Sequence, residues 1–234
     1  MKIFLKNIGV FKQAEYELGN LTIICGENNT GKTYATYSLF GFFDFWQRGF
    51  QIAIDDSKIS ELMEKGSLTI AINRNINELN KIIKAACGQY PKFLPRIIAA
   101  NEKYFENSNF EILLSESDVT ILDKYERKWG SGKNEMFQVS KESGKDELSV
   151  SLLVNSNEIN TFSTRLNITN AISEALKEII FKNTFGDIFI ASAERTGAVI
   201  FMKELNEEQN IILKEVAKNS DLDLGELLNK AYKS

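Results

Sequence analysis

Residues 21–37 read LTIICGENNTGKTYATY, and this stretch decides the fold that the sequence predicts. Residues 21–25 form a short apolar run rich in β-branched side chains, which is typical of a buried parallel strand. Residues 26–33 follow with the spacing G-x-x-x-x-G-K-[ST], and a helical pattern extends from Thr33 to Arg48. A strand, a glycine-rich loop and a helix therefore come in the order that a phosphate-binding loop, or P-loop, requires.

The residue types in this loop match the chemistry of a nucleoside triphosphate and Mg²⁺. Glycines at both ends let the backbone fold into a tight nest whose N–H groups point at phosphate oxygens, and the following helix adds the positive end of its dipole. We expect the Lys32 ammonium near the β- and γ-phosphates and the Thr33 hydroxyl on Mg²⁺. The predicted cofactor-binding residues of the loop are Gly26, Asn28, Asn29, Thr30, Gly31, Lys32 and Thr33.

Composition narrows the classes of protein further. The chain has 234 residues, 43% hydrophobic and 26% charged, as expected for a folded protein with one large domain or a domain with a sub-lobe. It contains no histidine, which excludes Ser-His-Asp and Cys-His nucleophile systems and histidine metal ligands. The distant Cys25 and Cys87 argue against a zinc site and fit a reducing compartment. A net charge of −4 argues against uniform coating of nucleic acid, but leaves a local basic patch open.

Targeting signals are not evident in the sequence. No apolar run approaches the roughly 18 residues that a membrane-spanning helix needs. The first ten residues, MKIFLKNIGV, lack the layout of a signal peptide. We therefore expect a cytoplasmic protein without membrane contact.

The residues before the loop connect the chain to a known group of ATPases. An apolar strand at 3–5, Asn7, a turn at Gly9 and a second strand at 13–18 lead into the P-loop within 30 residues. This opening resembles the ATP-binding heads of the SMC, RecF and OLD group of ABC-type ATPases. It is most similar to the bacterial AAA-type ATPases of that group found in phage-defence and mobile-element loci. The resemblance implies ATP and Mg²⁺ as cofactors and a role in antiviral defence.

A second segment supports the resemblance. Residues 187–197 read DIFIASAERTG, and the family commonly carries a strand followed by P-A-E-R-[ST]-G, with proline where this chain has Ser192. Ligands of open α/β sheets bind at the carboxyl ends of the strands. Glu194 is therefore a candidate catalytic carboxylate that orients water or metal, and Arg195 a candidate contact to phosphate or to a partner subunit. The alternative is a surface ion pair at the start of a helix over 199–218.

The predicted fold is an α/β P-loop NTPase sheet, similar to that of ABC ATPases, with an N-terminal β-hairpin and an inserted lobe. Four parts are expected: a P-loop ATP-binding core at 1–53, a helical insert at 54–109 with a short strand at 68–72, a β-meander at 110–154, and a return to the core at 155–234. Within these parts the patterns predict strands at 110–114, 136–139 and 148–154 and a helix at 167–181.

Two aromatic stretches have two interpretations each. Eight aromatic residues crowd residues 34–50, and burial of a helix against a sheet explains them better than a partner surface, although the last of them remain candidates for contact with another chain. Residues 124–133 interleave basic and aromatic side chains on a predicted hairpin, which could touch nucleic acid by charge and stacking. Flanking acidic residues favour a solvated hairpin instead.

Several parts of a complete ABC-type site are missing. The chain has no apolar strand ending in Asp-Glu, no Leu-Ser-Gly-Gly-type signature and no switch histidine. Three explanations compete: an N-terminal part of a longer or split ATPase, completed by a homodimer mate or partner protein; a nucleotide-binding interaction module without hydrolysis; or a variant site that uses Glu194. Another P-loop class, a GTPase or kinase, is a further alternative, but residues 80–83 and 229–232 lack the aspartate of the guanine motif N-K-x-D. DNA binding and the effector stay open.

Overall fold

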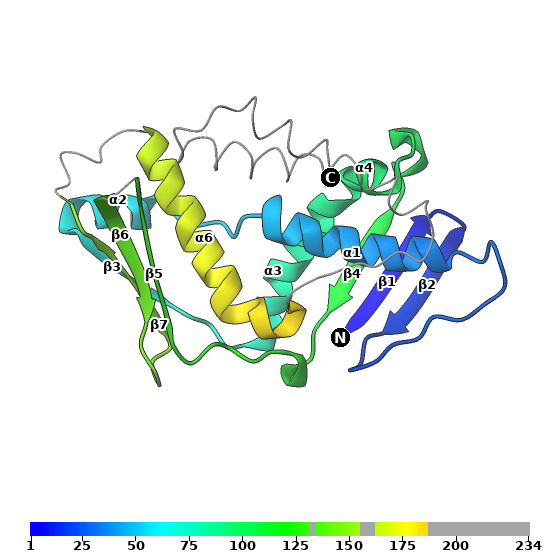
Figure 1. Ribbon diagram of the computed structural model, residues 1–234, viewed down its shortest axis with the longest axis horizontal. Coiled ribbons are helices and arrows are strands. Elements are labelled where there is room, and N and C mark those ends of the chain that lie inside the picture. Colours follow the sequence, from blue (N-terminus) through cyan, green and yellow to red (C-terminus); the bar gives the residue numbers. More distant parts are fainter. Residues whose placement is uncertain (132–133, 155–161, 187–234) are drawn as a thin grey trace, which may run out of the picture. The chain divides into compact units, whose positions relative to one another are not determined.

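The computed structural model describes residues 1–131, 134–154 and 162–186 (Figure 1). The chain divides into two units after residue 189, and all described residues belong to the first unit. The strand expected at 187–191, the helix expected at 199–218, and the candidate residues Glu194 and Arg195 lie outside the described residues.

The N-terminal hairpin belongs to a three-stranded antiparallel sheet. Strand β1 (Lys2–Ile8) pairs on one side with β2 (Phe11–Glu17) and on the other with β4 (Asn109–Leu113). Side chains alternate between the faces of a strand, so Leu5 and its partner Phe110 lie buried on one face. The predicted hairpin is present, whereas β4, which the sequence grouped with the meander, is a strand of this first sheet.

Helix α1 (Lys32–Arg48) supplies four buried aromatic side chains to the core: Phe42, Phe43, Phe45 and Trp46. The Phe42 ring stacks on Phe110 of β4 with centroids 5.0 Å apart, and Phe42, Phe45 and Trp46 are almost fully buried. Four helical elements of different lengths follow later in the chain: α3 (Ile76–Gln89), η1 (Tyr90–Lys92), α4 (Leu94–Ile98) and η2 (Glu102–Tyr104). Of these, α4 contacts α1, and α3 contacts β4. The Tyr90 hydroxyl donates to the Ser38 carbonyl of α1 at 2.7 Å. Burial in the core is thus confirmed for Phe42, Phe43, Phe45 and Trp46 of α1.

The second sheet has four antiparallel strands. Its order is β3 (Ser67–Ala71), β7 (Glu147–Leu152), β6 (Asn134–Lys141) and β5 (Tyr125–Ser131). Helix α2 (Asp56–Lys65) contacts β3, and the long helix α6 (Phe162–Phe185) contacts β6 (Figure 1). The strand at β3, expected as an interruption of the helical insert, therefore joins the meander strands in one sheet.

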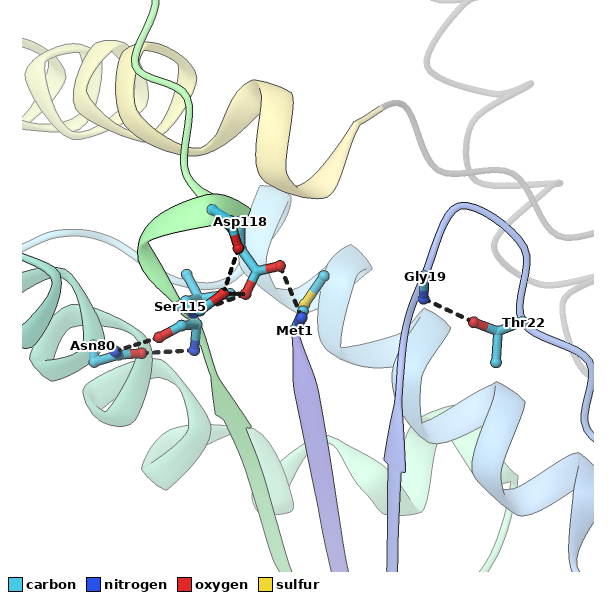
Figure 2. A network of polar contacts seen from close by, with 8 residues as sticks. Met1, Gly19, Thr22, Asn80, Ser115 and Asp118 are labelled. Atoms are coloured by element: carbon cyan, nitrogen blue, oxygen red, sulfur yellow. Dashed lines mark hydrogen bonds and ion pairs between the residues drawn. The ribbon is translucent and has the colours of Figure 1, made fainter.

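A polar network ties β1 to the segment after β4, where η3 (Glu116–Asp118) follows (Figure 2). The N-terminal ammonium of Met1 donates to Asp118 Oδ1 at 2.8 Å, and the Ser115 amide donates to Asp118 Oδ2 at 2.7 Å. Partial burial raises the pKa of Asp118, but the hydrogen bonds from the ammonium and Ser115 outweigh it and lower the pKa. Asn80 of α3 bonds both the N–H and the C=O of Leu114, each at 2.9 Å. These bonds fix one end of the first sheet to α3.

Candidate functional site

The loop at 26–31 leads directly into the N-terminus of α1. Gly31 is the residue before the helix, with a left-handed φ of 98°, and Asn29 also has a positive φ of 65°. The Ala35 amide makes the first helical hydrogen bond, to the Gly31 carbonyl at 3.0 Å. The amides of the three preceding helical residues therefore have no acceptor within the helix. They and the helix dipole form a site that favours an anion.

Lys32 spans this loop from the first turn of the helix. Its half-buried side chain brings Nζ to 2.7 Å from the Gly26 carbonyl and 2.5 Å from the Glu27 carbonyl. An ammonium has three N–H donors, so two hold the loop together and one is left for another acceptor. The Thr30 hydroxyl also donates to the Glu27 carbonyl, at 2.8 Å. The loop backbone thus surrounds the ammonium of Lys32, the residue predicted from the sequence to contact phosphate.

The other predicted loop residues are open to solvent. Gly26, Asn28, Asn29 and Thr33 are all exposed, and Thr33 lies in the first turn of α1, one residue beyond Lys32. Its hydroxyl is therefore accessible to a metal ion. No cluster of three or more metal-ligating side chains occurs within the described ranges. In P-loop sites a Ser or Thr hydroxyl at this position supplies one ligand of Mg²⁺, and phosphate oxygens, water and a carboxylate supply the others.

The turn of the β1–β2 hairpin supports the loop from the side. A Cβ added at Gly31 would lie 2.7 Å from both Val10 and Phe11, and one added at Gly9 would overlap the Tyr34 ring. Gly9 has a φ of 57°, so glycine relieves both strain and crowding there. In addition, the partly buried Tyr16 hydroxyl of β2 donates to the Ala35 carbonyl at 3.1 Å. The hairpin and the first turns of α1 therefore form one packed unit.

The segment before the loop differs from the sequence prediction. Residues 21–25 are not a strand, and Leu21 and Ile23 are 80% and 73% exposed. The Gly19 amide donates to the Thr22 hydroxyl at 3.0 Å, so a turn overlaps the start of this segment (Figure 2). The prediction of a buried strand is therefore wrong. A strand needs a hydrogen-bonded neighbour, and in the two described sheets no strand pairs with residues 21–25. These apolar residues have no pairing strand among the described residues.

The opposite end of α1 carries a feature that sequence analysis missed. Lys177 of α6 is only 8% exposed, and its Nζ donates to the carbonyls of Trp46, Gln47 and Phe50 at 2.9, 3.1 and 2.8 Å. The Trp46 and Gln47 carbonyls belong to the last turn of α1, and Phe50 follows the helix, so the cation lies where the helix dipole is negative. Burial lowers the pKa of Lys177. A lysine in a helix is normally exposed, and no signal in the sequence distinguishes Lys177 from an exposed lysine.

The basic and aromatic hairpin is β5–β6, and two of its cations, Arg127 and Lys128, face carboxylates. Arg127 lies 3.6 Å from Glu174 and 3.5 Å from Glu178 of α6, and Lys128 lies 2.8 Å from Glu135. Arg127 also covers the Trp129 ring, 4.9 Å from its centroid. Charges engaged in this way favour the solvated hairpin over a nucleic-acid surface.

Comparison of the chain with protein families, curated proteins and solved structures finds no match. Among the helices within residues 1–131, 134–154 and 162–186, none is long and apolar enough to cross a membrane.

Proposed function

We propose that the chain binds ATP with Mg²⁺ through residues 26–33, as the N-terminal part of an ABC-type ATPase. The observation that carries the proposal is the position of the Lys32 ammonium, which the Gly26 and Glu27 carbonyls hold within the loop that precedes α1. The first amides of this helix have no acceptor within the helix. This arrangement supplies positive charge and several N–H donors at one point, which is what a triphosphate requires.

In this proposal each loop residue has one task. Backbone amides at Asn28, Asn29 and Thr30 surround the phosphates, and the remaining N–H of Lys32 binds a β- or γ-phosphate oxygen. The Thr33 hydroxyl occupies one position of Mg²⁺. Bound ATP and Mg²⁺ supply the phosphoanhydride bond and the charge neutralisation that phosphoryl transfer needs. The hairpin turn at Val10 and Phe11 keeps Gly31 in its left-handed conformation.

Hydrolysis requires more than this loop. We assign the catalytic carboxylate to Glu194 and a phosphate or partner contact to Arg195, on the grounds of the sequence alone. A homodimer mate or a partner protein completes the site in this proposal. It would also supply a neighbouring strand to residues 21–25, where Leu21 and Ile23 are exposed and which no described strand pairs with. Nucleotide binding then controls docking of a partner or effector, in the cytoplasm and in defence against phage. The alternative is a nucleotide-binding module that does not hydrolyse ATP.

The test is calorimetric titration of the purified chain with ATP in the presence of magnesium. Lys32→Ala removes a charged hydrogen bond worth about 1.5–3 kcal/mol, so we expect binding to weaken by at least about tenfold. Lys84→Ala, at an exposed position of α3, is the matched control and should bind as the unmodified chain does. Unchanged binding by Lys32→Ala, with an intact circular dichroism spectrum, would contradict the proposal. A parallel GTP titration separates the GTPase alternative.

A further inference from the structure

The first turn of α1 is held against the β1–β2 hairpin at two separate points. At the hairpin turn, the Val10 and Phe11 side chains lie against Gly31, where an added Cβ would come within 2.7 Å of both. Farther along β2, the Tyr16 hydroxyl donates to the Ala35 carbonyl at 3.1 Å. Two separated contacts fix the direction of the helix start as well as its position.

These two points enclose the part of α1 that the nucleotide site uses. Lys32 and Thr33 lie between Gly31 and Ala35 in the sequence. The Ala35 amide makes the first bond of the helix, so the amides before it remain available to a ligand. A hydrogen bond weakens steeply when its angle at the hydrogen falls below about 120°, so a rotation of this turn would weaken binding of a phosphate.

Tyr16 is well placed to prevent such a rotation. It pairs in the sheet with Ile3 of β1, which is fully buried. Burial raises the pKa of the Tyr16 hydroxyl above its ordinary value, so the hydroxyl keeps the proton that it donates to the Ala35 carbonyl. Tyr16 is not among the residues predicted to contact a nucleotide, so its effect on a ligand runs through α1.

A second tyrosine offers a comparison on the same helix. The Tyr90 hydroxyl donates to the Ser38 carbonyl of α1 at 2.7 Å, and Tyr90 is fully buried. Both bonds run from a phenol to a carbonyl of α1. Ser38 lies about one turn beyond Ala35, where the backbone amides are bonded within the helix. The Tyr90 bond thus stabilises α1 at a place that offers no free amide to a ligand.

We propose that Tyr16 is a positioning residue of the nucleotide site. Its hydroxyl, through the Ala35 carbonyl, holds the first turn of α1 so that the free amides of Lys32 and Thr33 point at a phosphate. This inference rests on the proposed function, because Tyr16 has this role only where residues 26–33 bind a phosphate chain.

The test is calorimetric titration of the unmodified chain, Tyr16→Phe and Tyr90→Phe with ATP and with inorganic triphosphate, both in the presence of magnesium. Each replacement removes one hydroxyl and keeps the ring. A neutral hydrogen bond is worth at most about tenfold in an equilibrium, and only part of this reaches the ligand, so Tyr16→Phe should weaken ATP binding about three- to fivefold. Triphosphate should lose affinity by the same factor, because the affected amides hold phosphate. Tyr90→Phe should bind both ligands as the unmodified chain does.

Thermal unfolding, followed by circular dichroism, separates positioning from a general loss of stability. Tyr90→Phe should lower the melting temperature at least as much as Tyr16→Phe, because the Tyr90 bond is buried and the Tyr16 bond only partly so. Unchanged ATP affinity in Tyr16→Phe, or an equal loss of affinity in Tyr90→Phe, would overturn the proposal. An unmodified chain that binds neither ligand would instead remove the proposed function, and the role of Tyr16 with it.

Discussion

Replacing Gly9 by alanine tests whether the hairpin turn supports the start of α1. Gly9 has a φ of 57°, and the added Cβ would overlap the Tyr34 ring in the first turn of the helix. A left-handed conformation costs alanine about 1–2 kcal/mol, and a methyl group forced into filled space costs about 1–3 kcal/mol. We therefore expect Gly9→Ala to lower the free energy of unfolding by about 2–5 kcal/mol.

Gly144 provides the matched control. It has a φ of 73° in the turn between β6 and β7, but a Cβ there would meet nothing within 4 Å. Gly144→Ala should therefore cost only the backbone term of about 1–2 kcal/mol. Urea denaturation followed by circular dichroism measures both variants. In a Tyr34→Ala background, the cost of Gly9→Ala should fall to that of Gly144→Ala. Equal costs of the two glycine replacements in the unmodified background would refute packing between the turn and Tyr34.

Three further predictions address both ends of α1 and the loop. Burial holds the pKa of Lys177 below its ordinary 10.5, so the unfolded chain binds more protons between the two pKa values and stability rises with pH there. Urea titrations give the free energy of unfolding of the unmodified chain and of Lys177→Met at each pH. The difference, unmodified chain minus variant, should accordingly increase toward pH 10.5. A difference that does not change with pH would argue against desolvation of Lys177. Thr33→Val should weaken ATP binding by about tenfold with magnesium but not with EDTA, measured by calorimetry, and equal losses in both would remove Thr33 from the metal. Burial raises the pKa of the Cys87 thiol to about 12, whereas Cys25 is exposed. One thiol per native chain should therefore react quickly with a disulfide reagent. Bound ATP should slow this reaction, because Cys25 adjoins Gly26. Two fast thiols would contradict this burial.

The sequence predicted the features that depend on local spacing. The hairpin before the loop follows from alternating side chains around Gly9, and α1 begins at Lys32, one residue before the predicted start. The loop conformation follows from Gly31, because glycine adopts the left-handed φ that the turn to α1 requires. These signals lie within a few residues of one another.

Local sequence patterns did not predict which strands pair across long stretches of the chain. Strand β4 pairs with β1 across about a hundred residues, and no local period says which sheet a strand joins. Residues 21–25 have the composition of a buried strand, but a strand also needs neighbours, which residue types alone do not reveal. Lys177 is an ordinary polar residue of a helix in sequence terms. Only the packing of α6 against the end of α1 sets it apart.

The most direct test of the account is the effect of ligands on the backbone amides of the loop. In ¹H–¹⁵N NMR spectra, Mg²⁺-ATP and inorganic triphosphate should both shift the amide signals of Gly31, Lys32 and Thr33, whereas adenosine should leave them in place. Unshifted loop amides at millimolar ATP with magnesium, or equal shifts with adenosine, would contradict the claim that residues 26–33 hold a triphosphate.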